Sequence, residues 1–370
     1  MGARVGDRAG AWGWVSHLRD GGTTPWADYR TKDSQPVAEE PFGERLPGAQ
    51  QLELLRRINA ATGGRTVIAD GVLRATLTGR GQPEFALAGI VEIRPQIDPA
   101  ELAAGELLRV AASAIADALI LGGLPTPPEP PPVRRRRRHF HLLGDPWLTI
   151  PLREQLVLAG HPSGGMRART YVVGDRFDQL VVDAWSAACF DNGPAPWEAW
   201  LAKWTERDRV PGRVDLVAIA ERHRRRSRSV EIVLDPSLVG GLLGVRRPLS
   251  VPRRLAVSAL ELSRRVAVVL GGLVSAEERT TLLRSRLLPL VAETTGPRLA
   301  LPGQVGEWAQ AQAGGMRTAL ADAGYRVHGG WDALTASPDP TAATGKLFAD
   351  APTEAGALKA AVTLLGREVW

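Results

Sequence analysis

Three short apolar runs, each ending in an aspartate, dominate the pattern of hydrophobic and polar positions along this chain. They read HFHLLGD up to Asp145, ARTYVVGD up to Asp175 and SVEIVLD up to Asp235. Such runs, each followed by a helix-like segment, predict the strands of a short parallel sheet of three or more strands with helices on both faces, an α/β fold. Ligands of such sheets bind beyond the carboxyl ends of the strands, where we expect the three carboxylates to gather.

Helical periodicity accounts for much of the remaining chain. The predicted helices span residues 47–61, 99–121, 146–160, 177–190, 196–204, 214–225, 255–270, 276–291, 304–323 and 353–368. Residues 325–328 fit a short edge strand, and the polar stretch 26–46 is expected to be loop. Trp197, Trp200 and Trp204 recur at helical spacing, which predicts a packing stripe rather than a carbohydrate platform.

A proline- and arginine-rich stretch, PTPPEPPPVRRRRR, marks a boundary because prolines favour an extended spacer and adjacent arginines repel one another. We therefore predict a mainly helical N-terminal domain over residues 1–124 and a linker over 125–138. An α/β domain follows over 139–335, and a C-terminal loop and helix complete the chain over 336–370.

The net charge of +6 comes almost entirely from arginine, since lysine occurs only four times among 46 cationic residues. Together with the many Gly, Pro and Ala residues, this excess of arginine over lysine is typical of a GC-rich genome. Our main interpretation is therefore that the arginines are solvated surface charges. An alternative is a nucleic-acid or anionic-polymer surface formed by two arginine runs, of which the second is Arg222–Arg228. The candidate anion-binding residues of the first run are Arg134, Arg135, Arg136, Arg137 and Arg138.

One cysteine, Cys189, excludes an internal disulfide framework and fits a reducing compartment. The N-terminal residues contain no apolar signal-peptide core, and Arg109 and Asp117 interrupt the most apolar stretch, 107–124. We expect a cytoplasmic protein that has no membrane partner.

The aspartates at the strand ends have two interpretations. They could form a divalent-metal or acid–base cluster. Asp145 and Asp235 each precede a proline, however, and an aspartate before a proline typically caps a helix N-terminus. His139 and His141 alternate on one strand, but no third ligand lies at metal-binding spacing. We therefore predict no metal site and assign no catalytic residue.

Four segments resemble sulfotransferase-like proteins of actinobacteria, members of the P-loop sulfotransferase superfamily. Residues 301–334, LPGQVGEWAQAQAGGMRTALADAGYRVHGGWDAL, are similar to the closing helix of that family and the turn that follows it. YVVGDRFDQLVVDAW, residues 171–185, is similar to the segment that binds the 3′-phosphate of the sulfuryl donor PAPS. SVEIVLDP and HLLGDPWLTIPLREQL resemble a later strand and the donor-loop region. The resemblance covers about residues 139–335 and implies a sulfotransferase-like fold.

The chain departs from this family at the positions that bind PAPS. Where the family has Lys-Thr-Gly-Thr-Thr, this chain has Pro-Trp-Leu-Thr-Ile over residues 146–150, which retains only Thr149. Asp175 and Asp183 stand where the family has its 3′-phosphate arginine and serine, unless a one-residue slip brings in Arg176. An anionic donor would therefore meet carboxylates, which should abolish useful binding.

The sequence thus favours a degenerate sulfotransferase-like protein with a non-catalytic role in binding or assembly, without a cofactor. Its partner could be another protein or a second copy of the chain. One alternative is an active PAPS-dependent sulfotransferase that uses Thr149 and Arg176 at an atypical donor site. The other alternative is the nucleic-acid or anionic-polymer binder.

Overall fold

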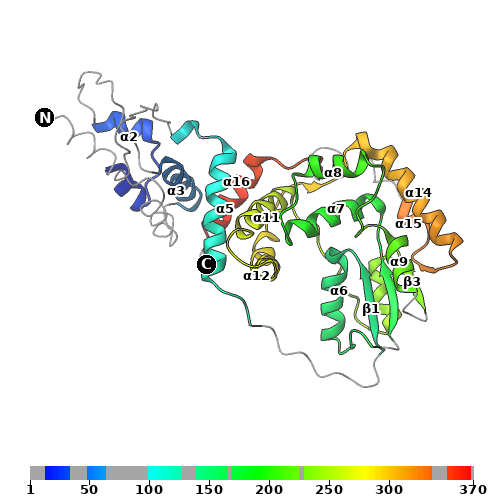
Figure 1. Cartoon of the computed structure of the whole chain (residues 1–370). Coiled ribbons are helices and arrows are strands. Elements are labelled where there is room, and N and C mark those ends of the chain that lie inside the picture. The colour runs from blue at the N-terminus through cyan, green and yellow to red at the C-terminus, as the bar shows by residue number, and fades with distance from the viewer. Residues whose placement is uncertain are drawn as a thin grey trace. The chain divides into compact units, whose positions relative to one another are not determined.

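The structure is a computed structural model of the chain, and it describes residues 13–33, 48–63, 99–126, 138–165, 168–224, 229–335 and 348–367 (Figure 1). Its elements are α2 (Trp26–Asp33), α3 (Ala49–Thr62), η2 (Pro99–Glu101), α5 (Ala104–Leu121), β1 (Phe140–Gly144), α6 (Pro146–Leu158), β2 (Arg169–Val173), α7 (Phe177–Cys189), α8 (Trp197–Thr205), α9 (Leu216–Arg224), β3 (Val230–Val233), η3 (Pro236–Leu238), α10 (Val239–Leu243), α11 (Val257–Leu270), α12 (Ala276–Leu282), η4 (Leu283–Leu287), α13 (Leu288–Val291), β4 (Arg298–Leu299), η5 (Gly303–Val305), α14 (Gly306–Asp322), β5 (Arg326–His328), α15 (Asp332–Thr335), β6 (Phe348–Ala349) and α16 (Glu354–Leu365).

The chain divides into two compact units. Unit 1 contains Met1–Leu124, Val268–Val274 and Thr353–Trp370. Unit 2 contains Pro125–Ala267 and Ser275–Pro352. Of the predicted linker, only residues 125, 126 and 138 are described, so most of that prediction falls outside the described residues.

Unit 2 is built on a four-stranded sheet with the order β1-β2-β3-β5, in which all neighbouring strands are parallel. The register places Leu142 beside Tyr171, and Tyr171 beside Glu231. The predicted α/β class with a short parallel sheet is therefore confirmed. The predicted edge strand at residues 325–328 is β5, which pairs with β3. Strands β4 and β6 form a second, two-stranded parallel sheet that the sequence pattern did not reveal.

Helices lie on both sides of the four-stranded sheet. On one side, α6 and α10 contribute Leu152, Leu156 and Val239 to a buried cluster with strand residues such as Phe140 and Tyr171. Helix α9 contacts β1, β2 and β3, and Figure 1 shows it across the sheet from α6. Burial on both faces explains why the strands read as continuous apolar runs.

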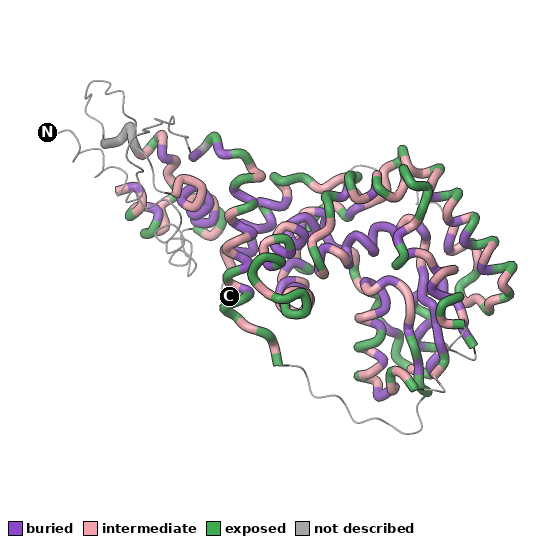
Figure 2. Tube along the Cα trace, viewed as in Figure 1, coloured by how far each residue is buried: buried purple, intermediate pink, exposed green. Residues whose placement is uncertain are grey.

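Helix α7 is buried along almost its whole length, as the purple tube in Figure 2 shows. Its Trp185 packs edge-on against Trp197 of α8 with the ring centroids 5.5 Å apart. Trp197 stacks on Trp200, which in turn contacts Trp204. The tryptophan spacing therefore marks a packing stripe, as predicted.

Unit 1 has its own helical core. Trp14, Leu18 and Trp26 pack against Leu52 and Leu55 of α3. The buried Asn59 side chain donates hydrogen bonds of 2.8 Å to the Leu18 carbonyl and 3.0 Å to that of Gly22. These bonds fix the N-terminal segment against α3 because a buried amide group left without partners would be costly.

The C-terminal helix α16 belongs to unit 1, where it packs against α5 and α3. Thr353 caps this helix by accepting a hydrogen bond from the Gly356 amide. The apolar faces of α5 and α16 are both buried, and Leu107, Leu108 and Leu358 are among their buried residues. Helix α16 thus completes a core that it shares with α3 and α5, which come from the first 124 residues.

Three predicted segments differ from the structure. The predicted helix 99–121 is divided into η2 and α5, because residues 102 and 103 are not helical. Residues 26–33, expected to be loop, form α2, because Trp26 is buried and packs 5.3 Å from Trp14. Residues 34–46 of that expected loop lie outside the described residues. The predicted helix 276–291 contains the π-helical turn η4. Pro289, two residues after this turn, has no amide hydrogen and removes one α-helical hydrogen bond here.

Replacing Gly144 with alanine should destabilise unit 2, because Gly144 has φ 130° and a Cβ would overlap the Val173 carbonyl oxygen. We expect the free energy of unfolding to fall by at least about 2 kcal/mol, measured by urea denaturation. Gly212→Ala is the matched control, since its Cβ would meet no heavy atom within 4 Å. Equal stability of the two variants would contradict the role of Gly144.

Candidate functional site

The corner between β1 and α6 is closed by its own aspartate. Asp145 caps α6: its Oδ1 accepts a 2.7 Å hydrogen bond from the Trp147 amide. The amides of Leu148 and Thr149 donate to the Asp145 carbonyl at 3.1 and 2.9 Å. Pro146 has no amide hydrogen. The backbone amides of the first four residues of α6 are therefore not available to donate a hydrogen bond to an external anion.

The side chains of this corner are buried as well. Asp145 is completely buried, and Thr149 is 3% exposed. The Thr149 hydroxyl donates a 3.0 Å hydrogen bond to the Asp145 carbonyl. The Trp147 ring, 5% exposed, packs 5.8 Å from the ring of Phe190. The predicted helix-capping role of Asp145 is confirmed, and the corner is filled by protein atoms.

At the corner between β2 and α7, the charged groups pair with each other. Asp175 Oδ1 accepts a 2.7 Å hydrogen bond from the Arg176 amide. The Arg176 guanidinium binds Asp178 with distances of 3.0 Å from Nε and 2.6 Å from Nη2. Arg176, the cation of the alternative donor site, is therefore already bound by a neighbouring carboxylate.

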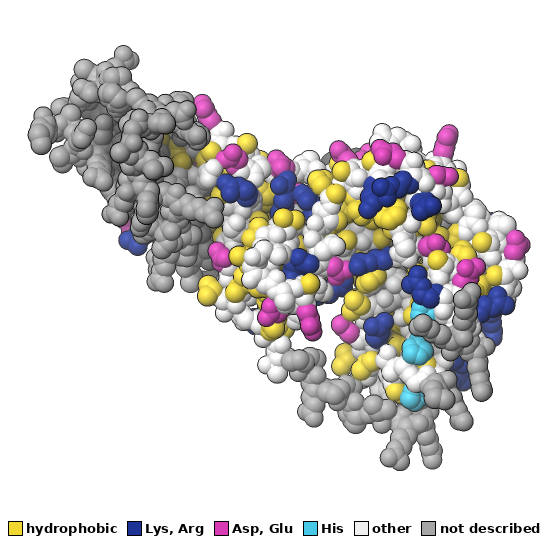
Figure 3. All heavy atoms as spheres, in the orientation of Figure 1, with side chains coloured by type: hydrophobic (Ala, Val, Ile, Leu, Met, Phe, Trp, Pro, Cys, Tyr) yellow, Lys and Arg dark blue, Asp and Glu magenta, His cyan; other side chains and the backbone are white. Residues whose placement is uncertain are grey.

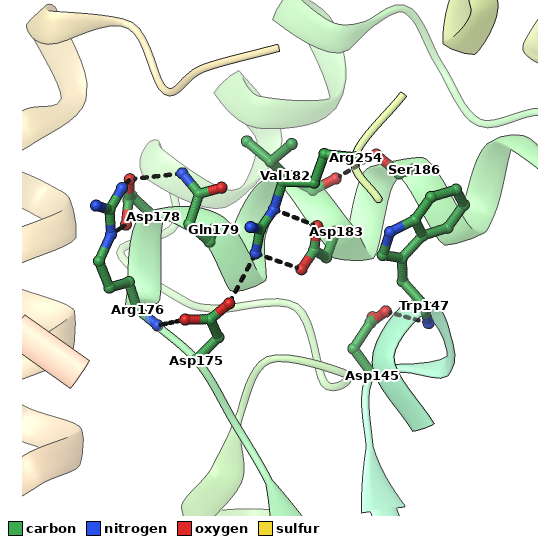
Figure 4. A network of polar contacts seen from close by, with 10 residues as sticks. All are labelled: Asp145, Trp147, Asp175, Arg176, Asp178, Gln179, Val182, Asp183, Ser186 and Arg254. Carbon is green, nitrogen blue, oxygen red and sulfur yellow. Dashed lines mark hydrogen bonds and ion pairs between the residues drawn. The ribbon is translucent and has the colours of Figure 1, made fainter. Parts of the chain in front are cut away.

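Arg254 pairs with two carboxylates of the β2–α7 region, Asp175 and Asp183, that lie far from it in the sequence (Figure 4). Its Nε lies 3.1 Å from Oδ1 of Asp183 on α7, and its Nη2 lies 3.1 Å from Oδ2 of the same carboxylate. The same Nη2 lies 2.8 Å from Asp175 Oδ2. Asp183 is completely buried, so this two-point pairing provides the countercharge that a buried carboxylate requires.

Burial is the main cause of the raised pKa values of the two most deeply buried carboxyl groups, those of Asp145 and Asp183. It raises the pKa of Asp145 from 3.8 to about 7, with a smaller increase from Asp183. The hydrogen bond from Trp147 and the charges of Arg213 and Arg284 act in the opposite direction. Burial also raises the pKa of Asp183 to about 6, although Arg254 lowers it.

A second group of arginines converges on Asp191, just beyond α7. Arg284 Nη2 lies 2.7 Å from one carboxylate oxygen of Asp191, and Arg213 Nη1 lies 2.9 Å from the other. Arg279 donates a 2.8 Å hydrogen bond to the Asp191 carbonyl. Arg284 comes from the π-helical turn η4, so this turn directs a cation towards the carboxyl end of the sheet.

The other predicted site residues lie elsewhere. Asp235 caps η3, and its Oδ1 accepts hydrogen bonds from the amide and the hydroxyl of Ser237, at 2.9 and 2.6 Å. No described contact joins it to the other strand-end aspartates, so only Asp145 and Asp175 belong to one cluster. Arg138 lies 3.5 Å from the Leu242 carbonyl, and Arg134–Arg137 lie outside the described residues.

Sequence reasoning missed Arg254 and the importance of Asp183. Arg254 lies 71 residues from Asp183 and 79 from Asp175, in a segment without regular structure before α11. Its sequence context, Val-Pro-Arg-Arg-Leu, gives no signal for a buried partner. The apolar surroundings of Asp183 within VVDAW were the available signal, because a carboxylate in a buried helix face needs a countercharge.

Among the described residues, no cluster of three or more His, Cys, Asp or Glu side chains could hold a metal ion. His139, a candidate ligand, bonds through Nδ1 to the Gly164 carbonyl at 2.9 Å. In the same described part of the chain, no helix has the length and apolar character needed to cross a membrane.

Comparisons with known proteins returned no match to this chain, whether among protein families, curated proteins or solved structures. Functional interpretation therefore depends on the contacts of the site itself.

Asp145→Asn should remove a large part of the pH dependence of stability. A carboxyl whose folded-state pKa is raised stabilises the fold most at low pH, and this contribution is lost as pH rises through about 7. Between about pH 5 and pH 8, the wild-type free energy of unfolding should fall by a few kcal/mol, and that of the variant by much less. Urea denaturation across this range measures both. Asp235→Asn, a strand-end cap outside the cluster, should behave like wild type.

Arg254→Met should strongly destabilise unit 2 near pH 8, because it leaves the buried Asp183 without its countercharge. We expect a loss of about 3–5 kcal/mol in urea denaturation. Arg317→Met removes an ion pair with Asp332, whose side chain is 96% exposed, and should cost less than about 1 kcal/mol. Similar losses in both variants would refute the structural role assigned to Arg254.

Proposed function

We propose that this protein is a degenerate member of the sulfotransferase-like proteins and acts in binding or assembly rather than in group transfer. One observation carries the proposal: the helix N-terminus that would bind a donor phosphate is capped by the protein's own Asp145. The Asp145 carboxylate already accepts the hydrogen bond from the Trp147 amide that an anionic ligand would need.

The surrounding charges support the same conclusion. Asp175, Asp178 and Asp183 lie around the carboxyl ends of β1 and β2, and the arginines present are paired with them. A donor with several negative charges would have to break ion pairs and displace the buried Trp147 ring before binding. Each of these steps costs free energy, and Arg176 and Arg254 are already paired with carboxylates.

The described basic residues give less support to a nucleic-acid surface. The visible face in Figure 3 shows Lys and Arg side chains interspersed with Asp and Glu rather than gathered in one basic stripe. Arg224, within the second arginine run, lies over the Tyr325 ring at 5.5 Å. A partner protein, or a second copy of this chain, fits such a mixed surface better than a polyanion does.

Isothermal titration calorimetry with adenosine 3′,5′-bisphosphate, the desulfated form of PAPS, tests the proposal. We expect no saturable heat at high micromolar ligand, because the first-turn amides of α6 are bonded within the protein and Arg176 and Arg254 are paired with carboxylates. Saturable binding that Arg176→Ala abolishes would replace the proposal with the atypical sulfotransferase. Sedimentation velocity over a range of protein concentrations provides the positive test, since self-assembly would appear as a concentration-dependent sedimentation coefficient.

Binding to a single-stranded oligonucleotide, measured at several salt concentrations, distinguishes the remaining alternative. An affinity that falls steeply with salt, and that falls again when Arg134–Arg138 are replaced by glutamine, would establish the polyanion binder instead. Weak binding, unchanged by this replacement, would support the proposal.

A further inference from the structure

An irregular segment between α10 and α11 carries four arginines around one serine. Residues 246–254 read Arg-Arg-Pro-Leu-Ser-Val-Pro-Arg-Arg, and residues 248–255 form neither helix nor strand. Two side chains anchor the segment: Leu249, 8% exposed, packs into the core cluster beside α10, and Arg254 pairs with carboxylates of the β2–α7 region (Figure 4). Residues 250, 251 and 253, between these anchors, are exposed.

The described hydrogen bonds of Ser250 are made by its backbone. The Gln155 side chain on α6 accepts a 2.8 Å hydrogen bond from the Ser250 amide and donates one of 2.9 Å to the Ser250 carbonyl. The Ser250 side chain is exposed, and its hydroxyl makes no hydrogen bond to another described residue. The segment thus presents a hydroxyl group to solvent at a position that Gln155 fixes.

Three of the four arginines lack a carboxylate partner. Arg246, Arg247 and Arg253 are exposed and form no ion pair with another described residue. They differ in this respect from Arg254, which is bound by two aspartates. Positive charge is therefore available on both sides of Ser250.

The two prolines of the segment favour an arrangement that brings the serine and two arginines together. Pro248 and Pro252 favour the polyproline conformation, which repeats every three residues. Arg247, Ser250 and Arg253 follow this spacing, so the conformation would place all three on one side of the segment. Their exposure agrees with this arrangement, since each of the three is exposed.

We propose that Ser250 is a phosphorylation site for a serine/threonine protein kinase that selects arginine-flanked segments. Such a kinase needs an accessible hydroxyl on a segment without regular structure, and acidic side chains of its substrate groove can pair with unpartnered arginines. Ser250 Oγ attacks the γ-phosphorus of ATP. The Oγ–P bond forms while the bond to the β–γ bridging oxygen breaks, ADP leaves, and the hydroxyl proton passes to the kinase's catalytic aspartate. The site is independent of the proposed binding function, because it requires only that this segment be accessible.

The phosphate would interact with the arginines of the same segment. A phosphoserine carries a charge of about −2 at pH 7, and arginine can pair with phosphate oxygens at two points. Phosphorylation would therefore join Ser250 to Arg247 and Arg253. It would also lower the combined charge of the three unpaired arginines from about +3 to about +1. The modification would thus remove most of the positive charge from this part of the surface.

Site-resolved mass spectrometry of the full chain tests the proposal. The protein is incubated with Mg²⁺, ATP and a purified arginine-directed serine/threonine kinase, in parallel with a synthetic peptide of residues 244–256. We expect phosphate on Ser250 at a rate within about tenfold of that of the peptide, since the two hydrogen bonds to Gln155 have to open first. Gln155→Ala should bring the two rates closer together. Arg247→Gln should lower the rate at Ser250 by about tenfold, because it removes a charge that the kinase recognises.

Ser285 is the control serine within the same protein. It is also exposed and lies between Arg284 and Arg286, but it belongs to the helical turn η4, and its hydroxyl donates to the Thr281 carbonyl. Its phosphorylation should be at least about tenfold slower than that of Ser250. A peptide that is phosphorylated while Ser250 of the full chain is not would show that the segment is inaccessible, and an unmodified peptide would show that its arginines are not recognised. Either result, or a faster reaction at Ser285, would overturn the proposal.

Discussion

Asp145 Oδ1 accepts a hydrogen bond from the Trp147 amide inside a completely buried corner, and the carboxyl end of the sheet is arranged around this bond. Gly144 turns the chain at a φ that alanine would not tolerate, and Pro146 begins α6 immediately afterwards. The tight corner puts a carboxylate, instead of bare amides, at the helix N-terminus. The filling of the corner by Trp147 and the raised pKa of Asp145 both depend on this placement.

A positively charged protein can still have an acidic interior. The chain has a net charge of +6, yet several of its arginines point inwards to carboxylates. Arg264, 7% exposed, pairs with the buried Glu261 on α11 in the same way. Such buried pairs contribute more to a specific arrangement than to net stability, because desolvation offsets much of the Coulomb attraction. The arginine count is therefore a poor guide to surface chemistry here.

The features that sequence reasoning predicted correctly are local ones. Strand runs, and the caps at Asp145 and Asp235, follow from residues within a few positions of each other. The Asp183–Arg254 pair was missed because its partners are 71 residues apart and neither sequence context specifies the other. Helix α2 was missed for a related reason: its sequence is polar, and the burial of Trp26 depends on Trp14 and α3. Tertiary contacts override weak local preferences in these cases.

The placement of α16 in unit 1 also has a consequence for biosynthesis. A ribosome makes α3 and α5 early, but their partner α16 follows only after the whole of unit 2 has been translated. Until then α5 can pack against α3 but lacks α16, its other partner in this core. The nascent chain must therefore carry an unfinished hydrophobic surface through most of its translation, the situation in which chaperones engage growing polypeptides.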